Sequence, residues 1–310
     1  MRGTWAQAQG GPGPVTRSGF IALAGRPNVG KSTLANAIVG AHVAIVSDKP
    51  QTTRRAIRGI ATGPDWQLVL VDLPGVQRPR DALTDRMQRR VERELHDADG
   101  CLLVVNAEEG IGPGDRFIAR LLQAAPVPVA LAVNKIDRTS RARTVAVLDQ
   151  AAQLEVGDEV FPVSARTGSG LRSLTDHLVS LLPEGPMYFE PQQHSDQSEP
   201  VRLAELVREQ VLRRTREEVP HAVEVQVESI QRQDRGDRGL VRIEAVVLVE
   251  TESQKRILIG AAGTMVKSIG MAARKVIEQE QGVQVHLDLR VRVRRHWRAD
   301  ERLLDRLGIE

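Results

Sequence analysis

The stretch Gly25-Arg26-Pro27-Asn28-Val29-Gly30-Lys31-Ser32 decides the fold of the first half of the chain. It matches the phosphate-binding pattern G-x-x-x-x-G-K-S/T and stands between an apolar run, Phe20–Ala24, and a helical run, Ser32–Val39. Glycines let the backbone N–H groups of such a loop turn towards phosphate, and the helix N-terminus adds positive potential. The pattern predicts a nucleotide site in which Lys31 holds the β- and γ-phosphates, the Ser32 hydroxyl binds Mg²⁺, and Thr33 lies beside the phosphates.

Apolar and helical runs alternate on both sides of this loop, from Gly19 to about Leu182. The expected buried strands are Phe20–Ala24, Gln67–Asp72, Gly100–Asn106, Val129–Asn134 and Val160–Val163. The expected helices are Ser32–Val39, Ala82–His96, Gly114–Gln123 and Arg141–Gln153. This alternation predicts an α/β domain with a doubly wound, mostly parallel sheet and a ligand at the carboxyl ends of its strands.

A second motif, Asp72-Leu73-Pro74-Gly75, ends one of these strands and brings a carboxylate to the same edge of the sheet. Asp72 is expected to hold Mg²⁺ through water, and the Gly75 N–H to contact a γ-phosphate. Val76 follows this motif. Because valine cannot orient an attacking water by hydrogen bonding, we expect slow intrinsic hydrolysis of a bound nucleotide.

A third motif, Asn134-Lys135-Ile136-Asp137, indicates the base. The Asp137 carboxylate can accept from guanine N1–H and from the exocyclic amine together, whereas adenine offers no such pair of donors and would leave a buried carboxylate unpaired. Lys135 is expected to lie along the base plane and Asn134 to brace the neighbouring loops. After the last strand comes Ser164-Ala165, whose Ala165 N–H is the predicted donor to guanine O6.

The composition limits the class of protein and its compartment. Of the 310 residues, 41% are hydrophobic and 27% are charged, which is typical of globular domains. No apolar run approaches the roughly 18 residues that cross a bilayer. Cys101 is the only cysteine, so we expect a cytoplasmic protein without an internal disulfide. The net charge is only +3, and 3% aromatic residues argue against a protein that stacks bases on aromatic side chains.

Proline-rich and polar stretches divide the chain. Residues 1–18 are predicted to be a flexible tail, residues 19–182 the nucleotide-binding domain, residues 183–200 a linker and residues 201–310 a second domain. The elements expected in this second domain are a helix at Arg202–Thr215, strands at Ala222–Ile230 and Leu240–Val249, an interrupted helical stretch at Ser253–Glu280 and a strand at Val283–Val293. Since strands and helices do not alternate one for one, the second domain is predicted to be a smaller α+β unit.

The interruption in the helical stretch is Gly260-Ala261-Ala262-Gly263. A G-x-x-G turn between two helices is typical of KH domains, where the backbone of four nucleotides passes the bare turn. A plain helix cap is the alternative, but the order helix, two strands, two helices, strand resembles a type II KH module. Because alanines occupy the centre of the turn, phosphate attraction is expected from Lys255, Arg256 and Lys267.

The last expected strand adds a row of positive charge. Arg290, Arg292 and Arg294 alternate with apolar residues, so they should share the face away from the core and are candidate RNA contacts. A solvated strand face is the alternative. Trp297 lies just beyond and is expected to pack in the core rather than to stack on a base.

The order of these motifs is similar to that of the Ras-like, translation-factor-related GTPases, and Pro50-Gln51-Thr52-Thr53-Arg54 narrows the match. With the phosphate loop and the KH-like domain, this string resembles the Era family of bacterial ribosome-assembly GTPases over nearly the whole chain after the tail. The resemblance implies that Thr53 closes over Mg²⁺ when a γ-phosphate is bound, and that hydrolysis depends on Lys31, Thr53 and Gly75. It also implies a switch II at Asp72–Arg80 and a switch I that includes Gln51, Thr52, Thr53, Arg54 and Arg55.

The same resemblance implies the partners: GTP and GDP, the 3′ end of 16S rRNA and the 30S subunit. It further implies a monomer that associates loosely with the inner face of the cell membrane. Similar GTPases with asparagine in the phosphate loop use K⁺, so Asn28 is a candidate K⁺ ligand beside the Mg²⁺ site. Two alternatives stay open, a GTPase that handles tRNA and an RNA-binding scaffold whose nucleotide site does not turn over.

Overall fold

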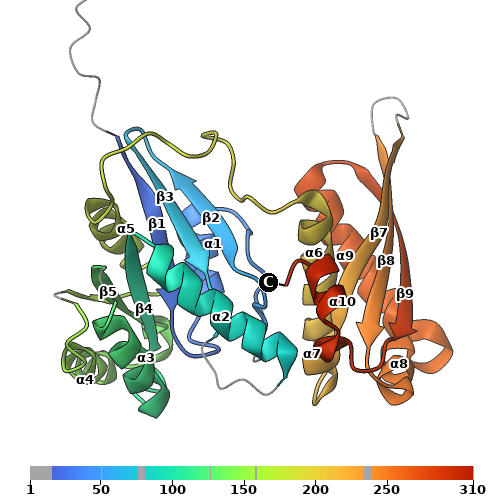
Figure 1. The fold of residues 1–310 in the computed structure, drawn as a ribbon, viewed down its shortest axis with the longest axis horizontal. Coiled ribbons are helices and arrows are strands. Elements are labelled where there is room, and N and C mark those ends of the chain that lie inside the picture. Colours follow the sequence, from blue (N-terminus) through green and yellow to red (C-terminus); the bar gives the residue numbers. More distant parts are fainter. Residues whose placement is uncertain are drawn as a thin grey trace, which may run out of the picture.

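The computed structural model describes residues 16–49, 51–75, 81–125, 127–157, 159–233 and 239–309. Two lobes, each with its own sheet, are joined by a long linker (Figure 1). Outside the described residues lie residues 1–15 of the predicted tail, Pro50, and the part of predicted switch II from Val76 to Arg80.

The N-terminal lobe contains a six-stranded sheet in the order β2-β3-β1-β4-β5-β6. Neighbouring strands are parallel, except that β2 runs antiparallel to β3. The strands are β1 (Arg17–Ala24), β2 (Ile57–Thr62), β3 (Trp66–Asp72), β4 (Gly100–Asn106), β5 (Val129–Asn134) and β6 (Val160–Pro162). Strands β3, β4 and β5 are nearly continuous apolar runs, as strands covered on both faces require. The predicted doubly wound, mostly parallel sheet is confirmed.

Helices cover both faces of this sheet. On one face α2, α3 and α4 pack around a core that includes Val91, Ile118 and Val147. On the other face α1 and α5 contribute Leu34 and Leu174 to a second core. The carboxyl ends of β1, β3 and β5 therefore lead into loops at one edge of the sheet. The helices are α1 (Lys31–Val39), α2 (Ala82–Asp97), α3 (Pro113–Gln123), α4 (Arg141–Ala152) and α5 (Leu171–Ser180).

The structure differs from the sequence-based expectation at the edges of this domain. Arg17 and Ser18, which the sequence assigns to the tail, are the first residues of β1, and Arg17 Nη1 donates to the Leu182 carbonyl at 2.7 Å. Strand β2 is not predicted at all. Its run is short and contains Arg58 and Gly59. As the edge strand of the sheet it pairs with a full strand on one side only, so it needs no continuous apolar sequence.

The linker packs along β3 and β2 of the first domain. The Gln67 side chain accepts from the N–H groups of Tyr188 and Phe189 at 2.8 and 2.9 Å, and its Nε2 donates to the Phe189 carbonyl at 2.9 Å. The Ile60 N–H donates to the His194 carbonyl at 2.9 Å. The linker is thus attached along β3 and β2 before it enters the second lobe.

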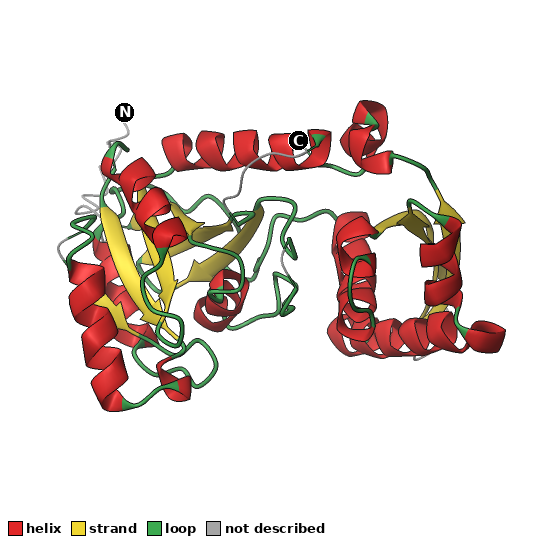
Figure 2. Cartoon of the chain, turned by 90° about the horizontal axis from the view of Figure 1, so that it is seen from below, coloured by secondary structure: helices red, strands yellow, loops and turns green. Residues whose placement is uncertain are grey.

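The C-terminal lobe places helices against a three-stranded sheet in the order β7-β8-β9, in which β7 and β8 are antiparallel and β8 and β9 are parallel. Figure 2 shows this smaller sheet, flanked by helices, apart from the larger one. The order helix, two strands, two helices, strand matches the predicted KH-like arrangement. The elements are α6 (Glu199–Arg214), α7 (Val219–Ala222), β7 (Glu224–Gln233), β8 (Leu240–Val249), α8 (Glu252–Ile259), α9 (Thr264–Gln281), β9 (Gln284–Val293) and α10 (Glu301–Arg306).

An apolar cluster joins the two lobes. Leu83 and Met87 of α2 pack with Val246, Trp297 and Leu304 of the C-terminal lobe. Trp297 is fully buried and its Nε1–H donates to the Ala222 carbonyl at 2.8 Å, which confirms its predicted place in the core. Within the described ranges no helix is both long and apolar enough to cross a membrane.

Candidate nucleotide and RNA sites

The phosphate loop connects β1 to α1. Its backbone conformation depends on glycine and on contacts with neighbouring residues. Gly30 has φ +102°, and a Cβ added there would lie 2.4 Å from Asn134 Nδ2. Lys31 is buried, and its Nζ donates to the Gly25 and Arg26 carbonyls at 3.0 and 3.2 Å. Burial lowers the pKa of Lys31, while the Asp72 carboxylate opposes that change. The lysine is therefore a desolvated cation held over the loop, where it can meet a phosphate.

Three oxygen-bearing side chains converge beside Lys31. Ser32 Oγ donates to Asp72 Oδ2 at 2.6 Å, Thr53 Oγ1 donates to the same oxygen at 3.2 Å, and the two hydroxyls are 3.1 Å apart. Burial raises the pKa of Asp72, while Lys31 and the two hydroxyls oppose the rise. The other carboxylate oxygen, Asp72 Oδ1, is buried without a hydrogen-bond partner among the described residues. A cluster of hard oxygen ligands with an unpaired buried carboxylate atom fits Mg²⁺.

The predicted base-binding loops meet as expected. Asn134 Nδ2 donates to the Val29 carbonyl at 3.0 Å, and Lys135 Nζ donates to the Asn28 carbonyl at 2.6 Å, so the loop after β5 braces the phosphate loop. Asp137 Oδ1 accepts from Ser164 Oγ at 2.7 Å. Asp137 is exposed in this structure, so the burial on which the sequence-based argument depends would have to come from a bound base.

The backbone N–H of Ala165 has a hydrogen-bond partner within the protein. Its N–H, which the sequence assigns to guanine O6, donates to Asn134 Oδ1 at 3.0 Å. A contact with O6 would require this N–H to be shared between two acceptors.

The side chains of Val29 and Leu73 are buried and that of Ile136 is partly buried against the core, so these three residues can offer a nucleotide mainly their backbone.

The pocket beside the phosphate loop is closed on one side by the segment before β2. Its lining includes Pro27, Thr33, Thr52 and Gly75, as the sequence predicts. Asn28 has φ +65° and donates from Nδ2 to the Asp48 carbonyl at 2.8 Å, which ties the phosphate loop to that segment. Arg26 points elsewhere, because its guanidinium binds Asp115 and Glu109 on the side of α3.

The G-x-x-G turn connects α8 to α9 through a single 3-10 turn, Ala261–Gly263. Gly260 and Gly263 have φ +73° and +78°, and Ala262 also lies in the left-handed region at +49°. A Cβ at Gly260 would lie 2.8 Å from Met265 Cβ, whereas a Cβ at Gly263 would meet nothing within 4 Å. The turn is thus bare on its Gly263 side, where an RNA backbone could approach.

A hollow between α9 and β9 joins Lys267, which the sequence indicates as a phosphate contact, to three side chains that the sequence does not indicate. Lys267 and Arg274 line it from α9, His286 lines it from β9, and Met271 lies in the same lining with its residue 54% exposed. Cations beside an exposed apolar side chain suit a nucleic-acid strand, which presents phosphates and base faces together. In the sequence, the available signal is that Met271 falls outside the apolar stripe of its helix, which is formed by residues such as Ile269, Ala273 and Ile277.

The predicted arginine row on β9 follows one face of the strand. Apolar residues of β9 such as Val285 and Val291 pack in the core with α9, so Arg290, Arg292 and Arg294 share the other face with Asp288, which also lines the hollow. Each of the three is also paired with a carboxylate, of Asp288, Glu228 and Asp300 respectively. Lys255 and Arg256 lie on α8 and Lys267 on α9, the two helices that flank the G-x-x-G turn, while the role of the three arginines in RNA binding stays a prediction.

The first domain has a phosphate-binding loop and a loop suited to guanine, and the second domain has a KH fold. Together these features define a P-loop GTPase with a C-terminal KH domain. The family described as 50S ribosome-binding GTPase matches residues 20–135, and the KH domain family matches residues 218–298. GTPase Era of Lactobacillus helveticus is 44% identical over 95% of this chain and 96% of its own length, and GTPase Era of Mycolicibacterium smegmatis is 44% identical over 94% and 98%.

Two solved structures of Era superimpose on most of this chain. Era in complex with MgGDPNP and nucleotides 1506–1542 of 16S ribosomal RNA superimposes with a TM-score of 0.91 at 33% identity, covering 95% of this chain and 99% of that one. A variant of Aquifex aeolicus Era bound to GDP·AlF₄⁻ superimposes equally well, at 32% identity. The chain belongs to the Era family of GTPases.

Proposed function

We propose that this chain is a GTP-hydrolysing switch that binds the 3′ end of 16S rRNA and acts in assembly of the 30S subunit. The observation that carries this proposal is the full-length match to a structure of Era with a GTP analogue and a 16S rRNA segment, which spans both domains of this chain. The family that matches residues 20–135 is described as a 50S ribosome-binding GTPase, but this match covers less than half of the chain. The two-domain match is therefore the stronger guide to the RNA.

In the nucleotide site, Lys31 contacts the β- and γ-phosphates and the oxygens of Ser32, Thr53 and Asp72 hold Mg²⁺, Asp72 through water. The support is their convergence within hydrogen-bond distance around an unpaired Asp72 Oδ1. When bound, Mg²⁺ neutralises negative charge on the phosphates. Gly75 lines the same pocket and offers its N–H to the γ-phosphate.

In the RNA site, the backbone passes the bare Gly263 side of the G-x-x-G turn and continues into the hollow between α9 and β9. Lys267 supports both parts of this path, because it follows the turn and lines the hollow. The arginines of β9 contribute mainly long-range attraction, since each is already paired. Membrane association and a monomeric state remain predictions from the family resemblance.

Co-sedimentation in a ribosome gradient tests the proposed function. With a non-hydrolysable GTP analogue the protein is expected to travel with 30S particles, and with GDP most of it is expected to stay at the top. Crosslinking in the 30S fraction should recover the 3′ end of 16S rRNA. Sedimentation with 50S particles, or crosslinking mainly to tRNA, would replace the proposed target with one of the alternatives.

The identity of the monovalent cation is expected to change the turnover number. Because no glutamine follows Gly75, an extra positive charge near the phosphates is the expected substitute, and Asn28 lies at the phosphate loop to hold it. We expect GTP turnover to be on the order of tenfold faster in K⁺ than in Na⁺ buffer. The matched variant is Asn28→Gly, since glycine accepts the φ of +65° at this position but lacks the amide oxygen. Equal rates in the two buffers, or a K⁺ response that persists in Asn28→Gly, would remove Asn28 from this role.

A further inference from the structure

The segment that carries Thr53 is held by the C-terminal domain. Arg54 is fully buried, and its Nη1 donates to Glu224 Oε2 at 2.8 Å and to the Val223 carbonyl at 2.5 Å. Its Nη2 donates to the His221 carbonyl at 2.9 Å. The guanidinium also lies 5.5 Å from the centre of the Trp297 ring. Every one of these partners belongs to the C-terminal lobe, so Arg54 is inserted into a neighbouring domain.

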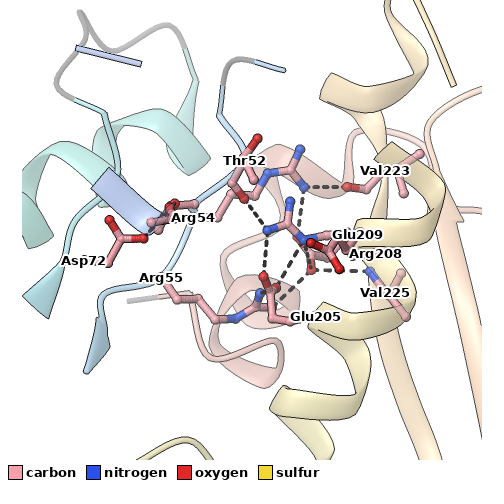
Figure 3. A network of polar contacts seen from close by, with 12 residues as sticks. Thr52, Arg54, Arg55, Asp72, Glu205, Arg208, Glu209, Val223 and Val225 are labelled. Atoms are coloured by element: carbon pink, nitrogen blue, oxygen red, sulfur yellow. Dashed lines mark hydrogen bonds and ion pairs between the residues drawn. The ribbon is translucent and has the colours of Figure 1, made fainter. Parts of the chain in front are cut away.

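The residues on both sides of Arg54 are held by the same domain, as Figure 3 shows. Arg55 Nη1 donates to Glu205 Oε1 at 2.6 Å, and its Nε donates to the Leu307 carbonyl at 2.9 Å. On the other side, Arg208 of α6 donates to the Thr52 carbonyl and to Glu205 Oε2. Thr53 therefore lies between contacts that fix the backbone before and after it.

The Thr53 side chain points away from this cluster and towards the nucleotide site. Its hydroxyl lies 3.2 Å from Asp72 Oδ2 and 3.1 Å from Ser32 Oγ, and the residue is buried. Within the first domain, the Lys49 carbonyl accepts from the Thr52 hydroxyl at 2.6 Å. Among the described residues, by contrast, the side-chain hydrogen bonds of Arg54 and Arg55 all lead to the C-terminal domain.

The charges in this cluster make it depend on an intact domain contact. Arg54, Arg55 and Arg208 face Glu205 and Glu224, and all five side chains are at least nine-tenths buried. Burial alone would raise the pKa of Glu224, but the arginines together lower it to about 2, so it is ionised at neutral pH. Removing one partner from such a group leaves a buried charge uncompensated, which is strongly unfavourable. The cluster is therefore expected to be either assembled or lost as a unit.

We infer that Glu224 and Arg208 of the KH domain are positioning residues for GTP hydrolysis, which act through Thr53. They hold Thr52, Arg54 and Arg55 so that the Thr53 hydroxyl stays at the oxygen cluster of Ser32 and Asp72. This inference depends on the proposed role of Thr53 as a Mg²⁺ ligand. The new element is that residues of the KH domain hold Thr53 in place. The RNA-binding domain therefore contributes to GTP hydrolysis.

Glu224→Gln is the direct test, because it keeps the shape of the side chain and removes its charge. Loss of a residue that orients a metal ligand typically costs about 10- to 100-fold in activity or metal affinity. We therefore expect single-turnover hydrolysis to slow by about tenfold and the Mg²⁺ concentration for half-maximal rate to rise. GDP affinity should change by less than about twofold, since GDP leaves no γ-phosphate for Thr53 to close over. In the nucleotide-free protein, amide hydrogen exchange of residues 51–55 should accelerate.

Controls separate positioning from general damage. Glu301→Gln removes another charge that bridges the domains, at Arg86 of α2, without touching the segment of Thr53, and is expected to leave all four measurements unchanged. If Glu224→Gln does not fold, the same measurements are made on Arg208→Met instead. It leaves two arginines facing two glutamates while it removes the contact with the Thr52 carbonyl.

A double-mutant cycle with Thr53→Ala gives the decisive comparison. If Glu224 acts through Thr53, Glu224→Gln should slow hydrolysis further by less than about twofold once Thr53 is alanine. Additive losses, or faster exchange at residues 51–55 without a change in rate or in Mg²⁺ dependence, would overturn the inference. Failure of the Mg²⁺ assignment would look different, because Thr53→Ala alone would then leave the Mg²⁺ dependence of hydrolysis as in the wild type.

Discussion

Asp137→Asn is expected to change the preferred nucleotide from GTP to xanthosine triphosphate. Guanine presents N1–H and an exocyclic amine, two donors that a carboxylate can accept together. An asparagine places its own NH₂ against one of them, whereas xanthine offers a carbonyl at that position. A hydrogen bond to a charged group is worth about 1.5–3 kcal/mol, so losing one of the two should weaken GTP binding by roughly 10- to 150-fold.

The structure prepares Asp137 for this role in one respect. Ser164 Oγ donates to Asp137 Oδ1 at 2.7 Å and so orients the carboxylate, and asparagine can keep this contact through its own oxygen. The fold should therefore survive the substitution. Calorimetric titration with GTP, ATP and xanthosine triphosphate measures the exchange of preference. Asp149→Asn makes the same chemical change on the exposed side of α4 and should bind GTP as the wild type does. GTP affinity that is unchanged in Asp137→Asn would mean that the base is recognised elsewhere.

The nucleotide site could be predicted from the sequence because each of its parts is a contiguous motif at the end of a strand. Lys31, Asp72 and Asn134 follow compact apolar runs, and parallel strands bring those ends together whatever the details of packing. Strand β2 could not be found in this way, since its edge position places no demand on its composition. Val76 lies outside the described residues, so the expected lack of a water-orienting group there stays a prediction.

The contact between the domains could not be predicted for a different reason. Glu205, Arg208 and Glu209 occur on a helix, where charged residues normally face water. Here α6 is buried on both sides: Leu206 packs in the KH core, and the charged side chains face the first domain. Only the fold shows that Arg54 and Arg55, more than 140 residues earlier in the chain, supply the opposite charge.

The arginines of β9 show what a regular pattern can and cannot predict. The alternation correctly predicts that Arg290, Arg292 and Arg294 share one face. It cannot reveal that each of them forms an ion pair with a carboxylate, so their contact with RNA stays a prediction. The RNA site must therefore be tested at the turn itself.

Gly263→Asp is expected to abolish RNA binding while GTP affinity stays within about twofold of the wild type. A Cβ at Gly263 meets no atom within 4 Å, whereas at Gly260 it would collide with Met265, so an aspartate at Gly263 has space but strains the backbone at its φ of +78°. A carboxylate on this bare side would lie in the proposed path of the phosphates, and like charges brought together at an interface cost several kcal/mol. That corresponds to a loss of at least about 100-fold in affinity.

Gly263→Asn separates the charge from the backbone. Asparagine has nearly the same shape and tolerates the φ of +78° better than most residues, but it brings no negative charge. Fluorescence anisotropy with an oligonucleotide from the 3′ end of 16S rRNA should show a loss of less than about tenfold for Gly263→Asn, and the gap between the two variants should narrow as salt screens the repulsion. Equal losses in both variants would show that the turn needs glycine for its backbone shape alone. RNA binding that survives Gly263→Asp would place the RNA away from this turn.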